Sequence, residues 1–270
     1  MNESVYEVIE QASSVLRLDF SSVEFANLIQ ENMLTEEDAN SIALVFEYLQ
    51  RKKKNATVQT LLRLSRLPLK TPRTFGNFDF SMLRGRDTAK LKSLQTLSAI
   101  HTHKNLAFIG PPGTGKTHLA QAFGYECCQQ GLKTYFIKMS ELKDRFMNAI
   151  QVGKTSSVIN GLVRPSCLII DEVGHCVLDR QCTQMFFDLV DRRYHKEGCY
   201  NMVFTSNKGP NDWAANFDER PSLLCALDRI FDNANVFTLK GNSYRGKELE
   251  NFAVRTTNIK APEEPLMPLG

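Results

Sequence analysis

Residues 110–117 read GPPGTGKT, which is a complete GxxxxGK[ST] phosphate-binding loop. The loop follows an apolar run at 106–109 that predicts a strand, and it precedes HLAQAFGYECCQQ, which favours a helix. A strand, this loop and a helix in succession form the setting that the motif needs. The glycines let backbone N–H groups face phosphate oxygens, and the start of the helix adds partial positive charge. The segment therefore predicts a nucleotide-phosphate site between a strand and a helix.

Two side chains of this loop supply charge and a metal ligand. Lys116 is expected to neutralise the β- and γ-phosphates, and the Thr117 hydroxyl is expected to bind Mg²⁺. The expected nucleotide-binding residues are Gly110, Pro111, Pro112, Gly113, Thr114, Gly115, Lys116, Thr117 and His118.

A pair of carboxylates ends the apolar run CLIIDE. Asp171 is expected to hold Mg²⁺ with Thr117, and Glu172 is expected to act as the general base that activates water. Two carboxylates at a strand end favour attack by water over phosphoryl transfer to another substrate. The loop and the acidic pair together predict Mg²⁺-dependent hydrolysis of a nucleoside triphosphate.

Three further polar side chains suit the same chemistry. Asn207 ends the run MVFTSN, where it can orient the lytic water near the γ-phosphate, although Asn is also a common turn residue. The following letters NKGP lack the Asp of the guanine-reading NKxD motif, which argues against a GTPase. Arg229 and Arg245 are cations that can meet charge on the γ-phosphate, and a surface salt bridge is the alternative for either one.

From residue 104 onward, apolar runs alternate with helix-forming stretches. Strands are predicted at 106–109, 134–138, 167–170, 201–205 and 235–239. Helices are predicted at 116–130, 140–150, 180–197 and 221–231. Five strands separated by helices indicate an α/β fold with a parallel, doubly wound sheet and ligands at the carboxyl ends of its strands. All of the motifs above are expected at those ends.

The first 67 residues predict a small all-α domain. Apolar positions recur with helical spacing through residues 5–50, which predicts three helices. Asp19, Ser21 and Thr35 are the candidate N-caps. A further helix is predicted at 57–67.

The rest of the chain divides by composition into three parts. Residues 68–86 contain Pro68 and Pro72 and predict an extended linker. Residues 87–100 predict a helix that leads into the nucleotide domain, which is expected to span 87–255. The tail, 256–270, holds three prolines and is expected to be disordered.

The net charge of +3 conceals a strong asymmetry. Residues 1–50 hold ten acidic residues against Arg17, a balance of −9, whereas residues 51–104 hold thirteen Lys or Arg against two Asp, a balance of +11. A basic block that begins RKKK is typical of a partner with a phosphate backbone. A solvated basic face that complements the acidic segment in the same chain is the alternative, and composition alone does not separate the two.

Composition also excludes several classes of protein. No apolar stretch approaches the roughly 20 residues that span a bilayer, and the acidic N-terminus lacks a signal-peptide pattern. The seven cysteines include no CxxC pair and no cluster with His at zinc spacing. We therefore expect a reduced, cytoplasmic protein with no structural metal and no membrane partner.

The motifs also carry a family resemblance. The runs GPPGTGKTHLA, LIIDEVG, TSN, LLCALDRIF and KGNSYR occur in the order and spacing of the IstB/DnaC-like AAA+ ATPases, and residues 75–250 most resemble the transposition-helper branch. The resemblance implies an AAA+ P-loop core with a minimal or absent C-terminal lid. It also implies a Walker A loop at 110–117, Walker B residues Asp171 and Glu172, sensor Asn207, an arginine finger Arg229 acting in trans, and a sensor-2-like Arg245.

Members of this family grip DNA with basic residues of the core and of the N-terminal domain. Here the candidates are Arg51, Lys52, Lys53, Lys54, Arg63, Arg66, Lys143, Arg145 and Lys154. Contacts of this kind with the phosphate backbone give affinity and salt dependence but little sequence selectivity.

The resemblance implies ATP and Mg²⁺ as cofactors and an ATPase that oligomerises on duplex DNA, with ATP at subunit interfaces, and assists a transposase. A replicative helicase loader is the alternative, since loaders share the ATPase motifs. The acidic helical segment 1–50 matches no motif of the family, and either DNA or a protein remains open as its partner. A small-molecule kinase is disfavoured by the acidic pair and by the lack of an acceptor site.

Overall fold

The computed structural model describes residues 4–83 and 87–240. Its centre is a parallel sheet of short, buried, apolar strands. The strands are β1 (Asn105–Ile109), β2 (Thr134–Lys138), β3 (Cys167–Val173), β4 (Asn201–Ser206) and β5 (Ala234–Thr238). They lie in the order β2-β3-β4-β1-β5, and every neighbouring pair is parallel. The five predicted strands are confirmed to within a few residues at their ends.

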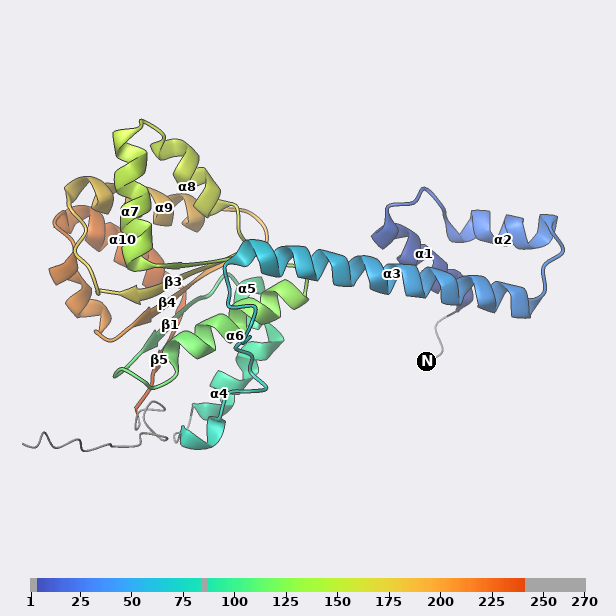
Figure 1. Cartoon of the computed structure of the whole chain (residues 1–270), viewed down its shortest axis with the longest axis horizontal. Coiled ribbons are helices and arrows are strands. Elements are labelled where there is room, and N and C mark those ends of the chain that lie inside the picture. Colours follow the sequence, from blue (N-terminus) through green and yellow to red (C-terminus); the bar gives the residue numbers. More distant parts are fainter. Residues whose placement is uncertain (1–3, 84–86, 241–270) are drawn as a thin grey trace, which may run out of the picture.

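Helices cover both faces of this sheet (Figure 1). One face packs against α7 (Met139–Gln151), α8 (Thr155–Val163), α9 (Arg180–Tyr194), α10 (Arg220–Asp232) and the 3₁₀ helix η3 (Pro210–Asn216). The other face packs against α6 (Lys116–Gln129), α5 (Ser98–His101), α4 (Thr88–Lys92) and the 3₁₀ helix η2 (Ser93–Thr96). The result is a three-layer α/β core in which β2 and β5 are the edge strands.

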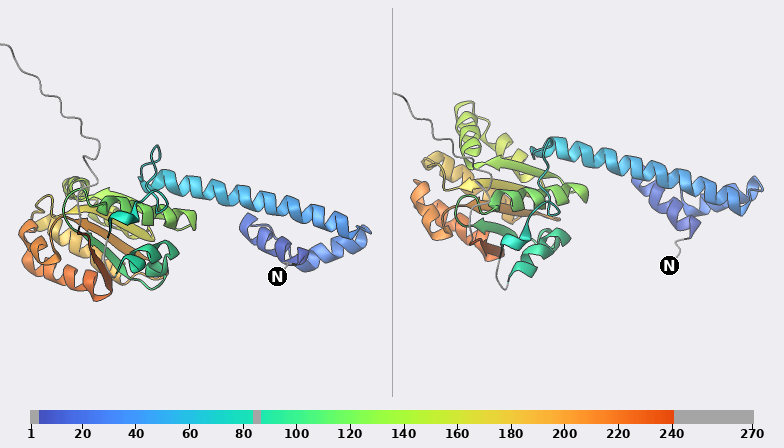
Figure 2. Two further views of the ribbon diagram at one scale, coloured as in Figure 1. Left: turned by 90° about the horizontal axis from the view of Figure 1, so that it is seen from below. Right: turned by 60° about the horizontal axis from the view of Figure 1, so that its bottom comes forward.

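The N-terminal region forms an arm that projects from this core (Figures 1 and 2). It consists of α1 (Val5–Leu16), α2 (Ser22–Glu31) and α3 (Glu36–Ser65). Ser4, Ser21 and Thr35 each begin a helix with a capping box, in which side chain and backbone exchange hydrogen bonds. The helices α1 and α2 pack on the outer half of α3 around Ile9 and Phe25.

The inner end of α3 belongs to the core. Leu62 and Leu67 are buried in the apolar layer that also contains α6. Beyond this end, the chain runs along the core through residues 68–79 to the 3₁₀ helix η1 (Phe80–Met82). The arm is therefore joined to the core by packed side chains as well as by the linker.

Four local predictions differ from the structure. The helices predicted separately before and within 57–67 are one continuous helix, α3, because residues 51–56 contain neither Gly nor Pro to end it. Asp19 is not an N-cap, since Ser21 begins α2. The helix predicted at 87–100 is divided into α4, η2 and α5, with Leu97 in the left-handed region at φ 57°. Helix α8 was not predicted, since no element was expected between the helix at 140–150 and the strand at 167–170.

Arg245, the tail 256–270 and the region in which a C-terminal lid would follow β5 lie outside the described residues. Within the described ranges, no helix is long and apolar enough to cross a membrane.

Candidate functional site

The phosphate loop lies between β1 and α6 and has the backbone that its sequence predicts. Gly113 and Gly115 have φ of 80° and 86°, in the left-handed region that favours glycine. Gly110 has a different reason to lack a side chain, because a Cβ there would overlap the carbonyl oxygen of Leu239. Leu239 also donates its N–H to Ile109 over 2.7 Å, so the end of β5 fixes the start of the loop.

The loop is closed by two hydrogen bonds to one carbonyl. Lys116 Nζ donates to Pro111 O over 2.6 Å, and Thr114 Oγ1 donates to the same oxygen over 2.9 Å. Lys116 is mostly buried, with 7% of its surface exposed. Its ammonium group is therefore held directly over the loop, where phosphate oxygens are the natural competitors for its protons.

Three side chains join the loop to the acidic strand. Thr117 Oγ1 donates to Asp171 Oδ1 over 2.9 Å, and Thr205 Oγ1 donates to the same oxygen over 2.6 Å. Thr205 in turn accepts a hydrogen bond from the backbone N–H of Glu172 over 2.9 Å. The carboxyl ends of β3 and β4 and the start of α6 thus meet at Asp171.

Asp171 is buried, and burial raises the pKa of its carboxyl group, whereas the hydrogen bonds from Thr205 and Thr117 lower it. A hydroxyl and a carboxylate at this spacing are the oxygen ligands that Mg²⁺ takes in nucleotide sites, where phosphates and water complete the shell. Within the described residues no cluster of three His, Cys, Asp or Glu exists that would favour a different metal. Thr117 and Asp171 therefore fit Mg²⁺.

Glu172 stands in a strained position beside this group. Its φ is +61°, and the pairing of β3 with β4 is irregular between Ile170 and Val173. A left-handed non-glycine residue costs about 1–3 kcal/mol and is typical of functional sites. The distortion aims the Glu172 side chain, half exposed, out of the strand, where Oε2 lies 3.7 Å from Lys138 Nζ.

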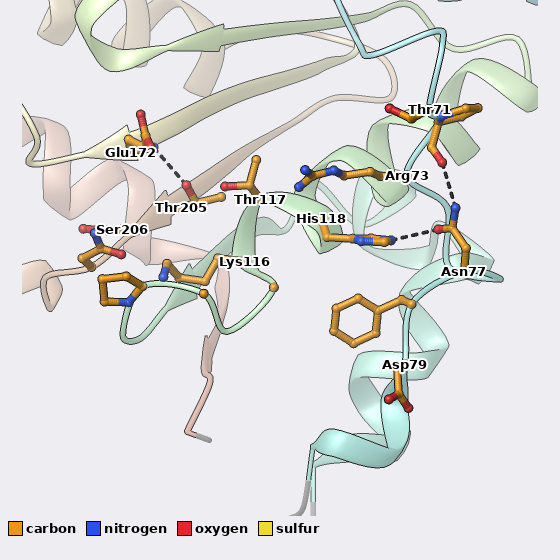
Figure 3. Close-up of a pocket in the computed structure, with 16 residues that line it drawn as sticks. Thr71, Arg73, Asn77, Asp79, Lys116, Thr117, His118, Glu172, Thr205 and Ser206 are labelled. Atoms are coloured by element: carbon orange, nitrogen blue, oxygen red, sulfur yellow. Dashed lines mark hydrogen bonds between the residues drawn. The ribbon is translucent and has the colours of Figure 1, made fainter. Parts of the chain in front are cut away.

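The linker supplies the opposite wall of the site (Figure 3). A cavity of about 550 Å³ is lined by Thr71, Pro72, Arg73, Asn77, Phe78, Asp79, Pro112, Gly113, Gly115, Lys116, Thr117, His118, Glu172, Thr205, Ser206 and Asn207. His118 is the contact between the two walls, because its Nε2 lies 3.0 Å from both Thr74 O and Asn77 Oδ1. Burial lowers the pKa of His118, and both oxygens are acceptors for a proton on Nε2.

The structure thus brings the residues of the two predicted Walker motifs together. Asn207 lies with them, exposed just after β4 on the rim of the cavity. Arg229 is not with them. It lies on the last turn of α10, in a hollow whose other lining residues include Asn105 and Met202. These residues begin β1 and β4, so the expectation that every motif lies at the carboxyl ends of the strands is wrong for Arg229.

The predicted DNA-contact residues fall into separate places. Arg66, Arg145 and Lys154 line one open hollow between the end of α3, α7 and α8. Arg66 and Arg145 lie over the ring of Tyr135, at 5.9 and 5.7 Å from its centroid, and Arg66 pairs with Glu141 at 2.8 Å. Arg51, Lys52, Lys53, Lys54 and Arg63 are exposed along α3, and Lys143 is half-buried on α7.

Sequence reasoning missed several residues of the site. Thr205 was hidden because a threonine within a buried strand is usual, and Lys138 because one lysine at a strand end carries no motif. The wall formed by the linker was not predicted, because residues 68–86 were expected only to be an extended connection. His175, after the acidic pair, is exposed in a turn.

The model of the family described as IstB-like ATP binding protein matches residues 16–251. The chain belongs to the IstB-like ATP-binding proteins. It is 37% identical over 197 residues to the ATP-binding protein of insertion sequence IS5376 from Geobacillus stearothermophilus, covering 73% of this chain and 76% of that protein. It is 33% identical over 201 residues to the protein of IS21 from Pseudomonas aeruginosa, covering 74% of each.

The solved structures similar to this IstB-like chain show the fold. DnaI matches with a TM-score of 0.55 at 17% identity, over 65% of this chain and 96% of that one. The DnaC helicase loader matches with a TM-score of 0.51 at 18% identity, over 62% and 97%. DnaA from Aquifex aeolicus, bound to AMPPCP, matches with a TM-score of 0.53 at 18% identity, over 65% and 52%. The core is therefore the AAA+ P-loop fold that the resemblance implied.

Proposed function

We propose that this chain is a Mg²⁺-dependent ATPase that assembles on duplex DNA and assists a transposase. The observation that carries the proposal is that Thr117 and Glu172 line one cavity while Thr117 donates a hydrogen bond to the buried Asp171. A phosphate loop alone binds a nucleotide, whereas a metal ligand pair with a second carboxylate beside it is suited to hydrolysis.

Each side chain has a part in that reaction. Lys116 neutralises phosphate charge, and Thr117 and Asp171 hold Mg²⁺, which supplies further neutralisation of the phosphates when bound. Glu172 accepts a proton from the attacking water, and Asn207 at the rim orients that water. His118 and the linker wall close the side of the cavity opposite Glu172.

The placement of Arg229 supports a site shared between subunits. Arg229 lines a different hollow from the cavity lined by the phosphate loop and Glu172. An arginine that neutralises charge on the γ-phosphate therefore comes from the neighbouring subunit. Head-to-tail contacts of this kind generate rings or helical filaments. Because ATP then lies between two subunits, assembly is expected to depend on ATP.

DNA is proposed to lie against two groups of basic side chains. The first is Arg51–Lys54 with Arg63 on the exposed surface of α3, and the second is the hollow with Arg66, Arg145 and Lys154. From residue 54 to residue 66 a helix rises about 18 Å, which a duplex backbone easily spans. Arg66 and Arg145 already contact Tyr135, so Lys154 and the α3 residues are the stronger candidates.

The relatives support transposition over helicase loading. The proteins at 37% and 33% identity are named for insertion sequences, whereas the helicase loader is similar only at 18% identity, in fold. A transposase is thus the proposed partner, and a replicative helicase is the alternative.

Binding to labelled DNA tests the proposal. With ATP and Mg²⁺, the chain is expected to bind duplex DNA more tightly than single strands, with affinity that falls steeply as salt rises. Replacing Lys52, Lys53 and Lys54 by Ala should reduce the salt slope, while the same change at the exposed Lys90 and Lys92 serves as a control of equal type. Binding confined to single strands would favour the helicase loader, and salt-independent binding would contradict phosphate contacts.

A further inference from the structure

We propose that Asp191 and Phe187, both on α9, are positioning residues for Arg229. They hold its guanidinium in the orientation in which it meets the phosphates of the neighbouring subunit. This inference rests on the proposed function, in which Arg229 acts in trans.

The contacts of Arg229 come from its own helix and from α9. Arg229 Nε lies 2.9 Å from Asp191 Oδ1 in an ion pair, and its guanidinium carbon lies 5.2 Å from the centroid of the Phe187 ring. Arg229 Nη1 also donates to Cys225 O over 3.1 Å, one turn earlier on α10. The guanidinium is thus fixed on one edge by charge and on one face by an aromatic ring.

These contacts leave a specific part of the guanidinium for a ligand. Nε and Nη1 are engaged, and Nη2 has no hydrogen-bond partner among residues 4–83 and 87–240. The side chain is 28% exposed and faces the hollow that Tyr194 and Asp232 also line. An arginine held at two points with one nitrogen left over is suited to receive a phosphate oxygen that arrives from outside.

Pre-positioning matters because an arginine side chain has several rotatable bonds. A mobile arginine must be ordered in the transition state, and that cost reduces the rate. Asp191 and Phe187 order the side chain in advance. Both residues are partly buried, and the helix that carries them packs against α10.

The same helix provides a matched control. Asp188 lies one turn before Asp191 and pairs with Arg192 over 2.8 Å. Both aspartates are on α9, both are partly exposed and both pair with an arginine. They differ in that Asp191 pairs with Arg229 and also lies 3.7 Å from Nδ1 of the exposed His195.

A subunit-mixing experiment tests the inference. Subunits with Arg229→Ala keep their own nucleotide site but lack the arginine that acts on the ATP of a neighbouring subunit. Subunits with Glu172→Gln keep that arginine but do not hydrolyse ATP. Mixing the two variants on duplex DNA is expected to restore ATP hydrolysis. The restored sites are those of Arg229→Ala subunits that receive Arg229 from a neighbouring Glu172→Gln subunit, which is called the donor. Three donors are compared: Glu172→Gln alone, with Asp188→Asn, and with Asp191→Asn.

The Asp188→Asn donor should restore hydrolysis as fully as Glu172→Gln alone, whereas the Asp191→Asn donor should restore roughly tenfold less or lower still. The Asp191→Asn change should lower kcat and leave ATP affinity, particle size and thermal unfolding unchanged. A merely structural role of Asp191 would change these last three quantities. Glu172→Gln combined with Phe187→Leu is a fourth donor and should reduce the restored rate by a smaller factor. Equal restoration by the Asp191→Asn and Asp188→Asn donors would overturn the inference, and no restoration by Glu172→Gln itself would overturn the trans role of Arg229.

Discussion

Thr117 Oγ1 donates a hydrogen bond to Asp171 Oδ1 over 2.9 Å, although the two residues belong to motifs far apart in the sequence. The bond places the end of β3 against the first turn of α6. Thr205 donates to the same carboxylate oxygen from β4. A carboxylate with two hydroxyl donors is held in one orientation, so the fold itself arranges the residues proposed to bind Mg²⁺.

Replacing Glu172 by Gln should separate binding from hydrolysis. The amide cannot accept the proton of water, so steady-state phosphate release should fall by about 10²–10⁴-fold. The affinity for ATP, measured with a fluorescent nucleotide, should change little. Glu197→Gln, at an exposed glutamate after α9, is the control. Wild-type hydrolysis by Glu172→Gln would remove Glu172 from its proposed role.

Thr205→Val should affect both stability and the Mg²⁺ dependence of ATP hydrolysis, whereas the same substitution at a matched buried threonine should affect stability alone. The change removes a donor from Asp171 and an acceptor from the N–H of Glu172, and buried groups left unpaired cost roughly 1–3 kcal/mol of unfolding free energy. It should also raise the Mg²⁺ concentration needed for half-maximal ATP hydrolysis.

Thr183→Val is the control for this effect. Thr183 is equally buried and donates to the carbonyl of Asp179 in the first turn of α9. Its replacement should reduce stability in urea unfolding while leaving the Mg²⁺ dependence as in wild type. The same Mg²⁺ dependence in both variants would mean that Thr205 has no special relation to the metal ligands.

The nucleotide site was largely predictable because its motifs are local. A phosphate loop needs a strand before it and a helix after it, and both can be read from apolar periodicity around 110–117. The end of the acidic strand was predictable for the same reason. The strand order was not predicted, since pairing between β1 and β4 depends on residues about a hundred positions apart.

The rest depended on contacts that have no sequence signature. The turn at Thr74 and Asn77 lines the site because His118 reaches its oxygens, which no local pattern reveals. The continuity of α3 was missed because the change from acidic to basic composition near Arg51 resembles a boundary, whereas helical propensity continues through it. Arg229 was named as a candidate site residue, but its position at the opposite end of the sheet was not predicted.

Arg193 is expected to be a principal stabilising residue of the core. It is fully buried, and its guanidinium donates to the carbonyl oxygens of Leu162, Val163, Pro165, Ser166 and Asn201. Burial lowers its pKa to about 10, so it remains charged at neutral pH.

Arg193→Leu should therefore reduce the free energy of unfolding by about 3 kcal/mol or more, because several buried carbonyls lose their donor. The neighbouring Arg192→Leu removes only exposed contacts, the pair with Asp188 and a hydrogen bond to Asn160, and should cost less than about 1 kcal/mol. Urea unfolding of both variants measures the difference. Equal losses would show that the carbonyl contacts of Arg193 contribute nothing beyond a surface pair.

The cysteines should differ widely in reactivity. Burial and the neighbouring Asp179 raise the pKa of Cys182 to about 12, so very little of this thiol is ionised at pH 7.5. Cys225 is exposed on α10. Brief alkylation followed by mass spectrometry should label Cys225 first and leave Cys182 unmodified until denaturant is added. Labelling of Cys182 at the rate of Cys225 would contradict the described packing of α9.

Cys225 also reports on assembly, because it lies one turn before Arg229. If α10 faces the neighbouring subunit, ATP and duplex DNA together should slow alkylation of Cys225. Arg229→Ala, which removes the finger, should lose much of this protection. Protection by ATP without DNA, at a concentration where the chain stays monomeric, would instead indicate a change within one subunit.

Sedimentation of the chain on duplex DNA tests the central claim most directly. With ATP and Mg²⁺ the protein–DNA particle should grow by addition of subunits, and with ADP, or with Lys116→Ala in the presence of ATP, it should not. That result would support a nucleotide site completed between subunits. Particles of the same size with ATP, with ADP and with Lys116→Ala would contradict it.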